Sequence, residues 1–358
     1  MVVARYPGAR VRVEDGITYR PLGFSLGHFG SMIAYHLSIP WYVMRHRADV
    51  IVEEFAAPHS TDLVSLFTPC PTVAMVQYLF AREKSAEYRV PFWPVENLGV
   101  AMHKSFISVS ASVAERIKAI NPDAVVEVVH AGVEPEAISP TAGEQPHLLF
   151  MGRLDFNVKG LDVLVDALQE VHKTWPGTRL CIAGTGPHEA RLRDLIDKRG
   201  LSKDVTWLGW IEGLEKWTAL ANAAVVLMPS RYETFGLVAL EAMSVGTPVV
   251  GSAIPSLEEI NGHSEGMVLV APCDAEAMGR EVSRILGSTE TRERMSQAAL
   301  KRAADFQWDI AVLATDRVYR EAARTQGMRS VRSRLRMLLA ALRSLRRIKR
   351  GPWPDTPA

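Results

Sequence analysis

The stretch that decides the fold is HLLFMGRLDFNVKGLDVLVDALQEVHKTW, residues 147–175. It opens with a short apolar run, which indicates a buried β-strand. A loop that contains two glycines follows, and then apolar residues recur at helical spacing. These are Leu161, Leu164, Val165, Leu168 and Val171. A buried strand, a loop and an amphipathic helix in this order are typical of one unit of an α/β fold.

The same order of strand and helix repeats as far as residue 252. Further strands are expected at 179–186, 205–210, 224–229 and 247–252. Helical patterns separate them at 188–200, 216–223 and about 236–245. Strands that alternate with helices in this way form a parallel sheet with helices on both faces.

Residues 1–133 follow a looser version of this pattern. Short β-branched runs predict strands at Val2–Ala4, Ala48–Val52, Thr72–Val76 and Phe106–Val109, and helices are expected at about 28–46, 94–103 and 111–119. Residues 134–147 are rich in Pro, Gly, Ser and Thr, which predicts a linker. We therefore expect two Rossmann-like α/β domains that face a central cleft, at 1–133 and 148–305. A helical segment at 306–327 and a tail at 328–358 would follow them.

The composition is that of a globular protein of two domains. The chain has 358 residues, 47% of them apolar, and its formal net charge of +1 does not favour nucleic acid as a partner. No apolar run reaches the roughly 18–20 residues that cross a bilayer, and the N-terminus shows no secretory pattern. Three widely spaced cysteines, Cys70, Cys181 and Cys273, suit a cytoplasmic protein without disulfides.

Three segments that follow strands carry candidate chemistry. In the first, Arg153 and Lys159 stand between Gly152 and Gly160, where the free N–H groups of a helix N-terminus favour anions. Two cations there suit a diphosphate, although an Arg and a Lys six residues apart are more often a solvated basic pair.

The second segment is ETFGLVALE, residues 233–241, and the third is AGTGP, residues 183–187. Gly236 would let a ligand approach the backbone, and Glu241 stands among apolar residues, where a carboxylate needs a partner such as a sugar hydroxyl. Gly184 and Gly186 suit a nucleotide, but they also suit an ordinary turn between strand and helix. The chain has no P-loop lysine, no zinc pattern and no Asp-x-Asp pair, so we expect neither a cofactor nor a metal.

Together these segments resemble glycosyltransferase family 4. The resemblance rests on FMGRLDFNVKGLDVLVDAL, LCIAGTGP, VTWLGWI and MPSRYETFGLVALEAMSVGTPVV, which keep the family's order and spacing across 148–260. The N-terminal half is similar more loosely, through SVSASVAERI and VVHAGVE. The resemblance implies the GT-B fold, a nucleoside diphosphate sugar as donor, and transfer that retains the anomeric configuration without a metal.

The resemblance also implies roles for individual residues. Arg153 and Lys159 would hold the donor diphosphate and stabilise the leaving group, and Glu233 would act with them in catalysis. Cations that are already in place lower the barrier as negative charge builds on the departing group. Backbone and side chains at the remaining positions would bind the donor, with Glu241 on the ribose and the loops at 184–186 and 209–211 beside the base. These positions are Gly152, Gly184, Gly186, Ile211, Thr234, Phe235, Gly236, Leu237 and Glu241.

The chain departs from the family pattern in two places. Family members begin with a strand, a Gly-rich loop and a helix ahead of the equivalent of VVARYPGAR, so this chain would lack a central strand of its first sheet. Buried backbone groups without that strand would be costly. In many relatives a histidine that reaches the donor sugar follows the strand like TVAMV, and here Gln77 takes its place. A glutamine can hydrogen-bond a hydroxyl group but cannot titrate.

The C-terminal tail differs in charge from the rest of the chain. Residues 329–350 carry nine Arg or Lys and no Asp or Glu, and an apolar row at helical spacing runs through them. The row consists of Val331, Leu335, Leu338, Leu342 and Leu345. This pattern predicts an amphipathic helix, which would bind an anionic membrane surface through 328–350. A helix packed on its own protein and a basic arm for nucleic acid are the alternatives.

The sequence thus predicts an enzyme at the inner face of the membrane that transfers a sugar to a glycan or lipid-linked acceptor. A sugar-nucleotide 2-epimerase of the same fold is one alternative. A non-catalytic nucleotide-sugar-binding or scaffold protein is the other, and the missing strand and Gln77 favour it.

Overall fold

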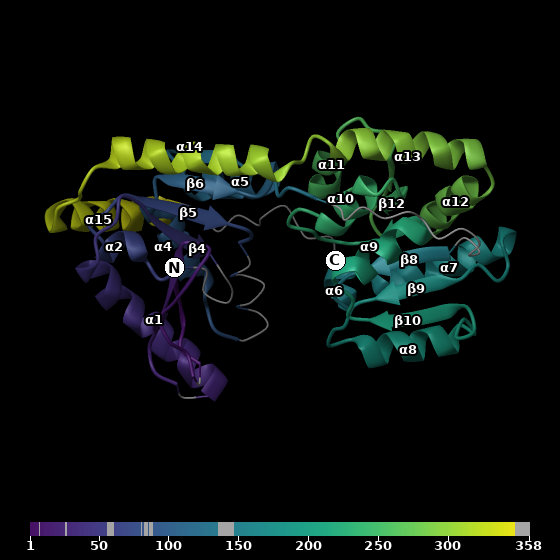
Figure 1. The fold of residues 1–358 in the computed structure, drawn as a ribbon, viewed down its shortest axis with the longest axis horizontal. Helices are drawn as coiled ribbons and strands as arrows, with labels where there is room; N and C mark the ends of the chain where they lie inside the picture. Colours follow the sequence, from purple (N-terminus) through teal and green to yellow (C-terminus); the bar gives the residue numbers. More distant parts are fainter. Residues whose placement is uncertain are drawn as a thin grey trace. The chain divides into compact units, whose positions relative to one another are not determined.

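The chain divides into two compact units in a computed structural model (Figure 1). The structure describes residues 1–6, 8–25, 27–55, 61–79, 81, 85, 89–134 and 147–347. Unit 1 comprises Met1–Val109, Val113–Val129 and Leu313–Gly351, and unit 2 comprises Ser110–Ser112, His130–Val312 and Pro352–Ala358. The predicted linker at 134–147 lies almost wholly outside the described residues.

Unit 2 is built on a six-stranded parallel sheet in the order β10-β9-β8-β11-β12-β13. Helices cover both faces of the sheet, which confirms the α/β prediction (Figure 1). The strands are β8 (His147–Met151), β9 (Leu180–Ala183), β10 (Val205–Gly209), β11 (Ala223–Met228), β12 (Val249–Ser252) and β13 (Met267–Val270). The helices are α6 (Phe156–Lys159), α7 (Leu161–Thr174), α8 (Glu189–Lys198), α9 (Gly213–Asn222), α10 (Leu237–Ser244), α11 (Pro255–Asn261), α12 (Ala275–Leu286) and α13 (Thr289–Ala303).

The apolar stripe of α7 forms part of the main core of unit 2. Its five predicted members are all buried, at 0–1% exposure. They pack among buried residues of β8 and β9 and beside α12. Burial on this scale holds the helix against the sheet, since each buried aliphatic side chain contributes about 1.5–3 kcal/mol.

The described residues of unit 1 form two sheets. Four parallel strands have the order β4-β5-β6-β7, and three strands have the order β1-β3-β2. The strands are β1 (Val2–Ala4), β2 (Arg12–Glu14), β3 (Ile17–Leu22), β4 (Ile51–Phe55), β5 (Thr72–Val76), β6 (Ser105–Ser108) and β7 (Val125–Val128). Among the described residues, β1 and β4 each pair on one side only. That the chain lacks a first strand stays a prediction.

The remaining helices of the described residues belong mostly to unit 1. They are α1 (Gly27–Arg45), α2 (Val64–Phe67), α4 (Trp93–Met102), α5 (Ala111–Ile120), α14 (Trp308–Gln326) and α15 (Val331–Arg347). Within the described part of the chain, no helix is both long enough and apolar enough to cross a membrane.

The sequence prediction was wrong for β4, which lies three residues beyond the expected Ala48–Val52. The reason is a buried carboxylate, Glu53, which looked like the end of a strand. Its oxygens accept hydrogen bonds from the hydroxyl group of Thr61 at 2.6 Å, from the backbone N–H of Asp62 at 2.7 Å and from His103 Nε2 at 2.8 Å. These partners lie beyond the strand in sequence, so local pattern does not reveal that the carboxylate is satisfied.

The antiparallel hairpin of β2 and β3 was missed, although its turn has a clear signal. Asp15 and Gly16 occupy the turn, with φ of 50° and 77°. An Asp-Gly pair with both φ values positive is typical of a two-residue hairpin turn. All of β2 and half of β3 are exposed, so the two strands lack the apolar alternation on which the prediction depended.

The C-terminal helices α14 and α15 are tied to unit 1. The side-chain amide of Gln326 donates to the carbonyl oxygen of Thr72 and to the hydroxyl group of Ser105, both at 3.0 Å. Arg334 donates to the carbonyl oxygens of Leu66 and Phe67, where α2 ends. The tail is therefore a helix that packs on its own protein, which is one of the alternatives that the sequence left open.

Packing uses only one side of α15. The helix contacts α2 and α4, with Ala341 buried and Leu338 half-buried. Of the predicted row, Val331, Leu335 and Leu342 are exposed, and the side chain of Leu345 lies outside the described residues. An apolar row therefore remains on the surface of the tail.

Candidate active site

The three candidate segments follow neighbouring strands of unit 2. The strands β9, β8 and β11 lie side by side, and they lead into residues 184–186, 152–160 and 229–236 respectively. In open α/β sheets, ligands bind outside the carboxyl ends of the strands. The fold thus brings segments that are far apart in sequence to one edge of the sheet.

Glycines allow these loops to meet backbone to backbone. A Cβ atom on Gly184 would lie 1.9 Å from the carbonyl oxygen of Gly152, and one on Gly160 would lie 2.0 Å from that of Pro229. A Cβ on Gly186 would lie 2.5 Å from the carbonyl oxygen of Leu154. No larger residue fits at these distances, so the glycines hold the loops together whether or not they also contact a ligand.

Lys159 and Glu233 form the polar centre of this edge. Lys159 Nζ lies 2.5 Å from Glu233 Oε1, and the hydroxyl group of Ser230 donates to the same oxygen at 2.7 Å. The ammonium group also lies 3.8 Å from the place that a Cβ on Gly152 would take. The pair is largely buried, with 16% and 10% of the two side chains exposed. It holds a cation in a fixed position, where diphosphate oxygens could form charge-assisted hydrogen bonds with it.

The two arginines of the predicted segments have different surroundings. Arg153 is exposed and forms no ion pair with another described residue. Arg231, which the sequence analysis did not assign, donates to both carboxylate oxygens of Asp162 at 2.9 and 2.7 Å and to the carbonyl oxygen of Phe156. Burial raises the pKa of Asp162, but the hydrogen bond and charge of Arg231 outweigh it and leave that pKa below its usual value. Arg231 thus ties the segment after β11 to α6 and α7.

Glu241 already has a partner in the structure. Its Oε1 atom lies 2.9 Å from Lys216 Nζ, and the ammonium group of Lys216 lies 4.3 Å from the ring centroid of Trp217. A buried carboxylate needs a partner, and here a lysine takes the place that the sequence analysis gave to a ribose hydroxyl. A ligand at Glu241 would share the carboxylate with Lys216.

Of the other predicted donor-binding residues, Ile211 follows β10, and the rest lie at the start of α10. Gly236 precedes the helix with φ of 100°, which only glycine adopts readily. Phe235 is 4% exposed and Ile211 is 8% exposed, whereas Leu237 is 47% exposed. Thr234 is half-buried. Phe235 therefore serves the packing of this loop, while Thr234 and Leu237 are the residues that a ligand could reach by their side chains.

A histidine that sequence reasoning missed packs against this loop. The ring of His130 stacks on Phe235, with ring centroids 5.5 Å apart and an angle of 17° between the rings. Its Nε2 atom lies 2.6 Å from Glu259 Oε1, and Phe306 packs against both rings. The VVHAGVE segment contained the histidine, but only the fold brings it to α11 and to the loop before α10.

Gln77 lies in unit 1, directly after β5. Its side-chain amide donates to Glu54 Oε1 at 2.9 Å, and both side chains are exposed. The pair stands at the carboxyl ends of two neighbouring parallel strands, β4 and β5. Gln77 is thus held by its own unit, with a carboxylate as its hydrogen-bond partner.

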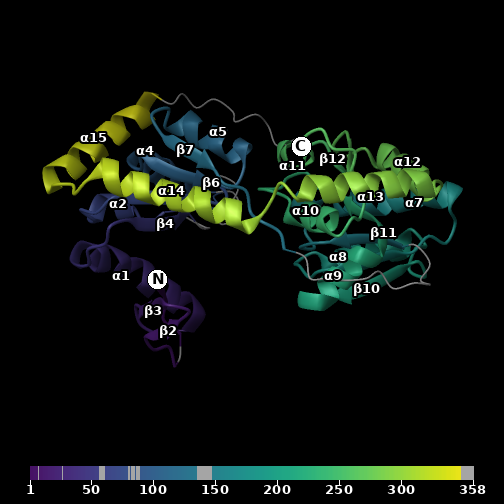
Figure 2. The same ribbon diagram turned by 45° about the horizontal axis from the view of Figure 1, so that its top comes forward.

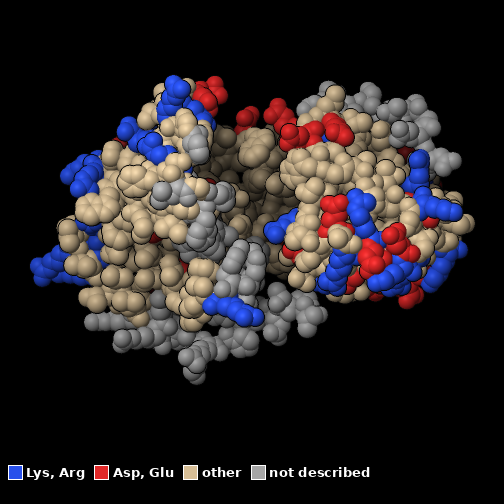
Figure 3. All heavy atoms as spheres, turned by 90° about the horizontal axis from the view of Figure 1, so that it is seen from below, with Lys and Arg blue, Asp and Glu red and all other residues tan. Residues whose placement is uncertain are grey.

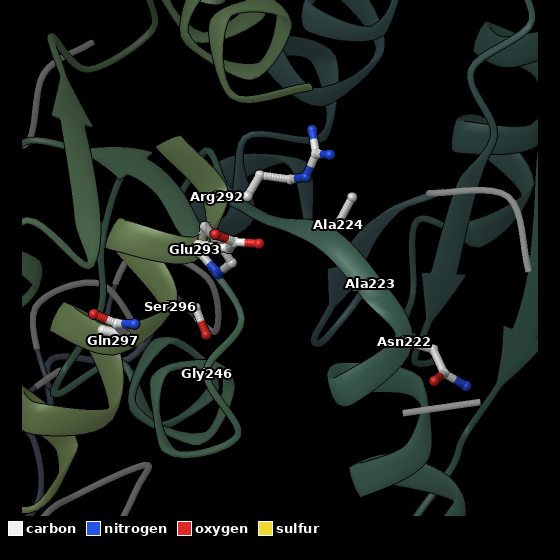
Figure 4. A pocket seen from close by; sticks show the side chains of 9 residues that line it. Asn222, Ala223, Ala224, Gly246, Arg292, Glu293, Ser296 and Gln297 are labelled. Atoms are coloured by element: carbon white, nitrogen blue, oxygen red, sulfur yellow. The ribbon is translucent and has the colours of Figure 1, made fainter. Parts of the chain in front are cut away.

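A groove at the opposite edge of the unit 2 sheet offers no comparable chemistry. It is lined by residues at the start of β11, by residues before β12 and by one side of α13 (Figure 4). Its arginine, Arg292, donates to the carbonyl oxygens of Ile285 and Leu286, at 3.0 and 2.6 Å. The groove does not include any of the candidate residues.

The region that contains these loops is similar to known proteins. Residues 134–302 match the family model of the group 1 glycosyl transferases. The glycogen synthase of Mycobacterium tuberculosis is 34% identical over 256 residues, which cover 69% of this chain and 61% of that protein. The phosphatidyl-myo-inositol mannosyltransferase of Mycobacterium leprae is 31% identical over 213 residues, which cover 58% of this chain and 56% of that protein. The chain thus spans about three fifths of the length of these relatives.

A solved structure of the same architecture extends the similarity to the whole fold. Anabaena Alr3699/HepE, in complex with UDP and glucose, has a TM-score of 0.68 at 18% identity, and the match covers 86% of each chain. A likeness at this identity shows the fold alone. It agrees with the GT-B architecture that the sequence predicted, and it includes residues of both units.

Proposed function

Because this chain belongs to the group 1 glycosyl transferases, we propose that it transfers a sugar from a nucleoside diphosphate sugar to a glycan or lipid-linked acceptor. The transfer would retain the anomeric configuration. The bond between the anomeric carbon and the diphosphate oxygen breaks, and the acceptor hydroxyl oxygen forms the new bond to that carbon. The hydroxyl proton passes to the departing diphosphate, so no nucleophilic side chain is consumed.

One observation carries this proposal: the Lys159–Glu233 pair at the edge of the unit 2 sheet. Lys159, with Arg153, would take the charge that builds on the leaving diphosphate, because a cation fixed in advance stabilises that charge best. Glu233 would weaken its hydrogen bond with Lys159 and contact the donor sugar. Gly152, Gly184 and the loop before α10 would let the diphosphate approach the backbone.

The donor site is tested by nucleotide binding to the purified chain. UDP is the first probe, since Alr3699/HepE was solved with it, followed by GDP, ADP and their sugar conjugates. A nucleotide that binds only the native state raises the melting temperature. Lys159→Ala should weaken binding more than about tenfold, because a hydrogen bond to a charged group is worth about 1.5–3 kcal/mol. Lys173→Ala is the matched control, since Lys173 lies on the exposed side of α7 and pairs with Glu170.

Turnover separates the proposal from its alternatives. Glu233→Gln should keep the fold and lose transfer to a panel of glycan and glycolipid acceptors. Equal nucleotide affinity in Lys159→Ala and the parent chain would refute the assignment of the donor site to Lys159. Donor binding without any transfer would point to the non-catalytic alternative, and an epimerised nucleotide sugar formed without acceptor would point to the epimerase.

A lipid-linked acceptor would place this enzyme at a membrane surface. The mannosyltransferase relative is named for a lipid acceptor, and the basic tail would hold this protein at an anionic surface through 328–350. Support comes from the exposed residues of α15, where Arg332 and Arg336 flank the apolar row. A protein held there would act as a peripheral enzyme at the inner face of the membrane.

A further inference from the structure

A second exposed apolar row lies on α1 of unit 1. Ile33, Leu37, Trp41 and Met44 are 47%, 70%, 61% and 44% exposed. Steps of four, four and three residues place them on one side of a helix, because each residue turns the helix by about 100°. Four large apolar side chains in line on the surface of one helix are an interaction surface, not scattered single residues.

The opposite side of α1 already attaches the helix to unit 1. Ile39 and Val43 are each 5% exposed and pack with Val64 of α2, and Tyr35 and Tyr42 lie beside them. The apolar row is therefore not needed to hold α1 in place. The row is therefore available for a contact outside unit 1.

The charges of the chain segment that contains α1 indicate the partner for that contact. One acidic group lies beside the helix, where His36 Nδ1 contacts Asp62 Oδ1 at 2.8 Å. Residues 17–48 contain three arginines, Arg20, Arg45 and Arg47, and no Asp or Glu. The guanidinium group of Arg45 lies 4.7 Å from the ring centroid of Trp41, at the end of the row. Figure 3 shows unit 1 from the side on which α1 lies in Figure 1, with a broad uncharged surface, Lys or Arg along much of its border, and Asp or Glu at the upper edge. A tryptophan-containing apolar row beside arginines is typical of a helix that lies in a membrane interface.

The tail helix presents a surface of the same kind. On α15 the exposed residues Val331, Leu335, Leu339 and Leu342 repeat the spacing of four, four and three. Both helices contact the short helix α2, which lies between them in the two ribbon views (Figures 1 and 2). Unit 1 thus carries two helices with exposed apolar rows as neighbours: α15, which is rich in arginine, and α1, which ends in Arg45.

We propose that α1 docks on an anionic lipid bilayer and forms a membrane contact in addition to the tail. This inference rests on the proposed action at a membrane, but it does not depend on the donor site. A second copy of the chain is a poorer partner, because its own α1 carries no Asp or Glu that could pair with Arg45. An anionic bilayer supplies both an apolar interior for the row and negative headgroups for the arginines.

Vesicle co-sedimentation of the full chain tests the proposal. The vesicles contain phosphatidylglycerol mixed with phosphatidylcholine, or phosphatidylcholine alone. Leu37→Glu/Trp41→Glu should bind the anionic vesicles at least about tenfold more weakly than the parent chain, because two large apolar side chains no longer enter the interface. Leu300→Glu, at a 47% exposed position of α13 in unit 2, is the matched control and should bind as the parent does. The parent should bind phosphatidylcholine vesicles only weakly.

A conservative variant keeps the test independent of folding. Trp41→Phe should retain vesicle binding and lose part of the fluorescence quenching by brominated lipids, because Trp41 would be among the tryptophans at the bilayer. Unchanged binding by Leu37→Glu/Trp41→Glu, or unchanged quenching in Trp41→Phe, would overturn the proposal. A shift from dimer to monomer in the charged variant without any change in vesicle binding would also overturn it, in favour of self-association.

Two further variants separate this proposal from the function. Leu335→Glu/Leu339→Glu tests the tail by the same assay, and Lys159→Ala tests the donor site by UDP binding. If only the tail variant loses vesicle binding, the α1 proposal fails and the tail proposal stands. If Lys159→Ala loses UDP binding while the α1 variant keeps it, the donor site stands whatever the vesicles show.

Discussion

The helices α7 in unit 2 and α1 in unit 1 show the same apolar periodicity and end in different surroundings. Every member of the α7 stripe is buried, because the sheet lies under it and α12 lies beside it. On α1, Ile39 and Val43 are buried, whereas Leu37 and Trp41 are 70% and 61% exposed. Periodicity therefore predicts that a helix forms, but the fold decides whether an apolar face becomes core or surface.

The largest expected effect tests this difference directly. Leu164→Ala should lower the free energy of unfolding of unit 2 by about 2–5 kcal/mol, because it removes a fully buried side chain and leaves a cavity. Leu37→Ala should change the stability of unit 1 by no more than about 0.5 kcal/mol. Hydrogen exchange during urea unfolding measures the two units separately. Similar losses in both variants would mean that the α1 row is core after all.

A smaller loss of stability is expected where two loops of unit 2 approach each other at a glycine. Gly184→Ala places a Cβ at 1.9 Å from the carbonyl oxygen of Gly152, at φ of +130°. We expect a loss of about 2–3 kcal/mol and weaker UDP binding, because the two loops must move apart. Gly200→Ala is the matched control: its φ is +72° and nothing lies within 4 Å of the added atom.

The Gly200→Ala control separates the strain of a positive φ from the effect of the close approach of the two loops. Gly200→Ala should cost only about 1 kcal/mol, which is the strain of a left-handed alanine, and should leave UDP binding unchanged. Urea unfolding and UDP-induced thermal shifts provide both readouts. Equal costs at the two positions would mean that the close approach of the loops contributes nothing.

The sequence was sufficient for the architecture of unit 2 and for the family, because both depend on local patterns. Strand, glycine loop and amphipathic helix follow each other within about 30 residues in each repeat. The ion pair of Lys159 with Glu233, the Arg231–Asp162 pair and the Lys216–Glu241 pair were not predictable in the same way. Each joins residues from different loops or helices, and only the order of strands in the sheet makes them neighbours.

Unit 1 was predicted less well because its sequence signals are indirect. A charged residue, Glu53, lies in the middle of β4. Its burial there is understandable only when its hydrogen-bond partners Thr61 and His103 are known. The return of the C-terminal helix to unit 1 depends on Gln326, whose partners at the starts of β5 and β6 are more than 200 residues away. The sequence showed that the tail is basic and helical, but not that Arg334 fastens it to α2.

The smallest expected effect concerns stability. It comes from comparing two arginine contacts that attach helices to their units. In unit 2, Arg231 binds the carboxylate of Asp162, whereas in unit 1 Arg334 binds the carbonyl oxygens of Leu66 and Phe67. A carboxylate titrates in acid and a carbonyl oxygen does not. The folded-state pKa of Asp162 is lowered, so its contribution is fully present above the unfolded value of about 3.9 and is lost as the pH falls through the folded value.

Asp162→Asn should therefore cost no more than about 1 kcal/mol at pH 7, because the carboxylate is 45% exposed and solvent screens the pair. The difference between this variant and the parent should shrink as the pH falls below about 4. Arg334→Gln should destabilise unit 1 by an amount that stays constant over the same range. Unfolding free energies measured for the three proteins from neutral to acid pH decide the matter. An Asp162→Asn difference close to zero at every pH would mean that Arg231 fastens the loop through the Phe156 carbonyl oxygen alone, and that both units use pH-independent contacts to hold their helices.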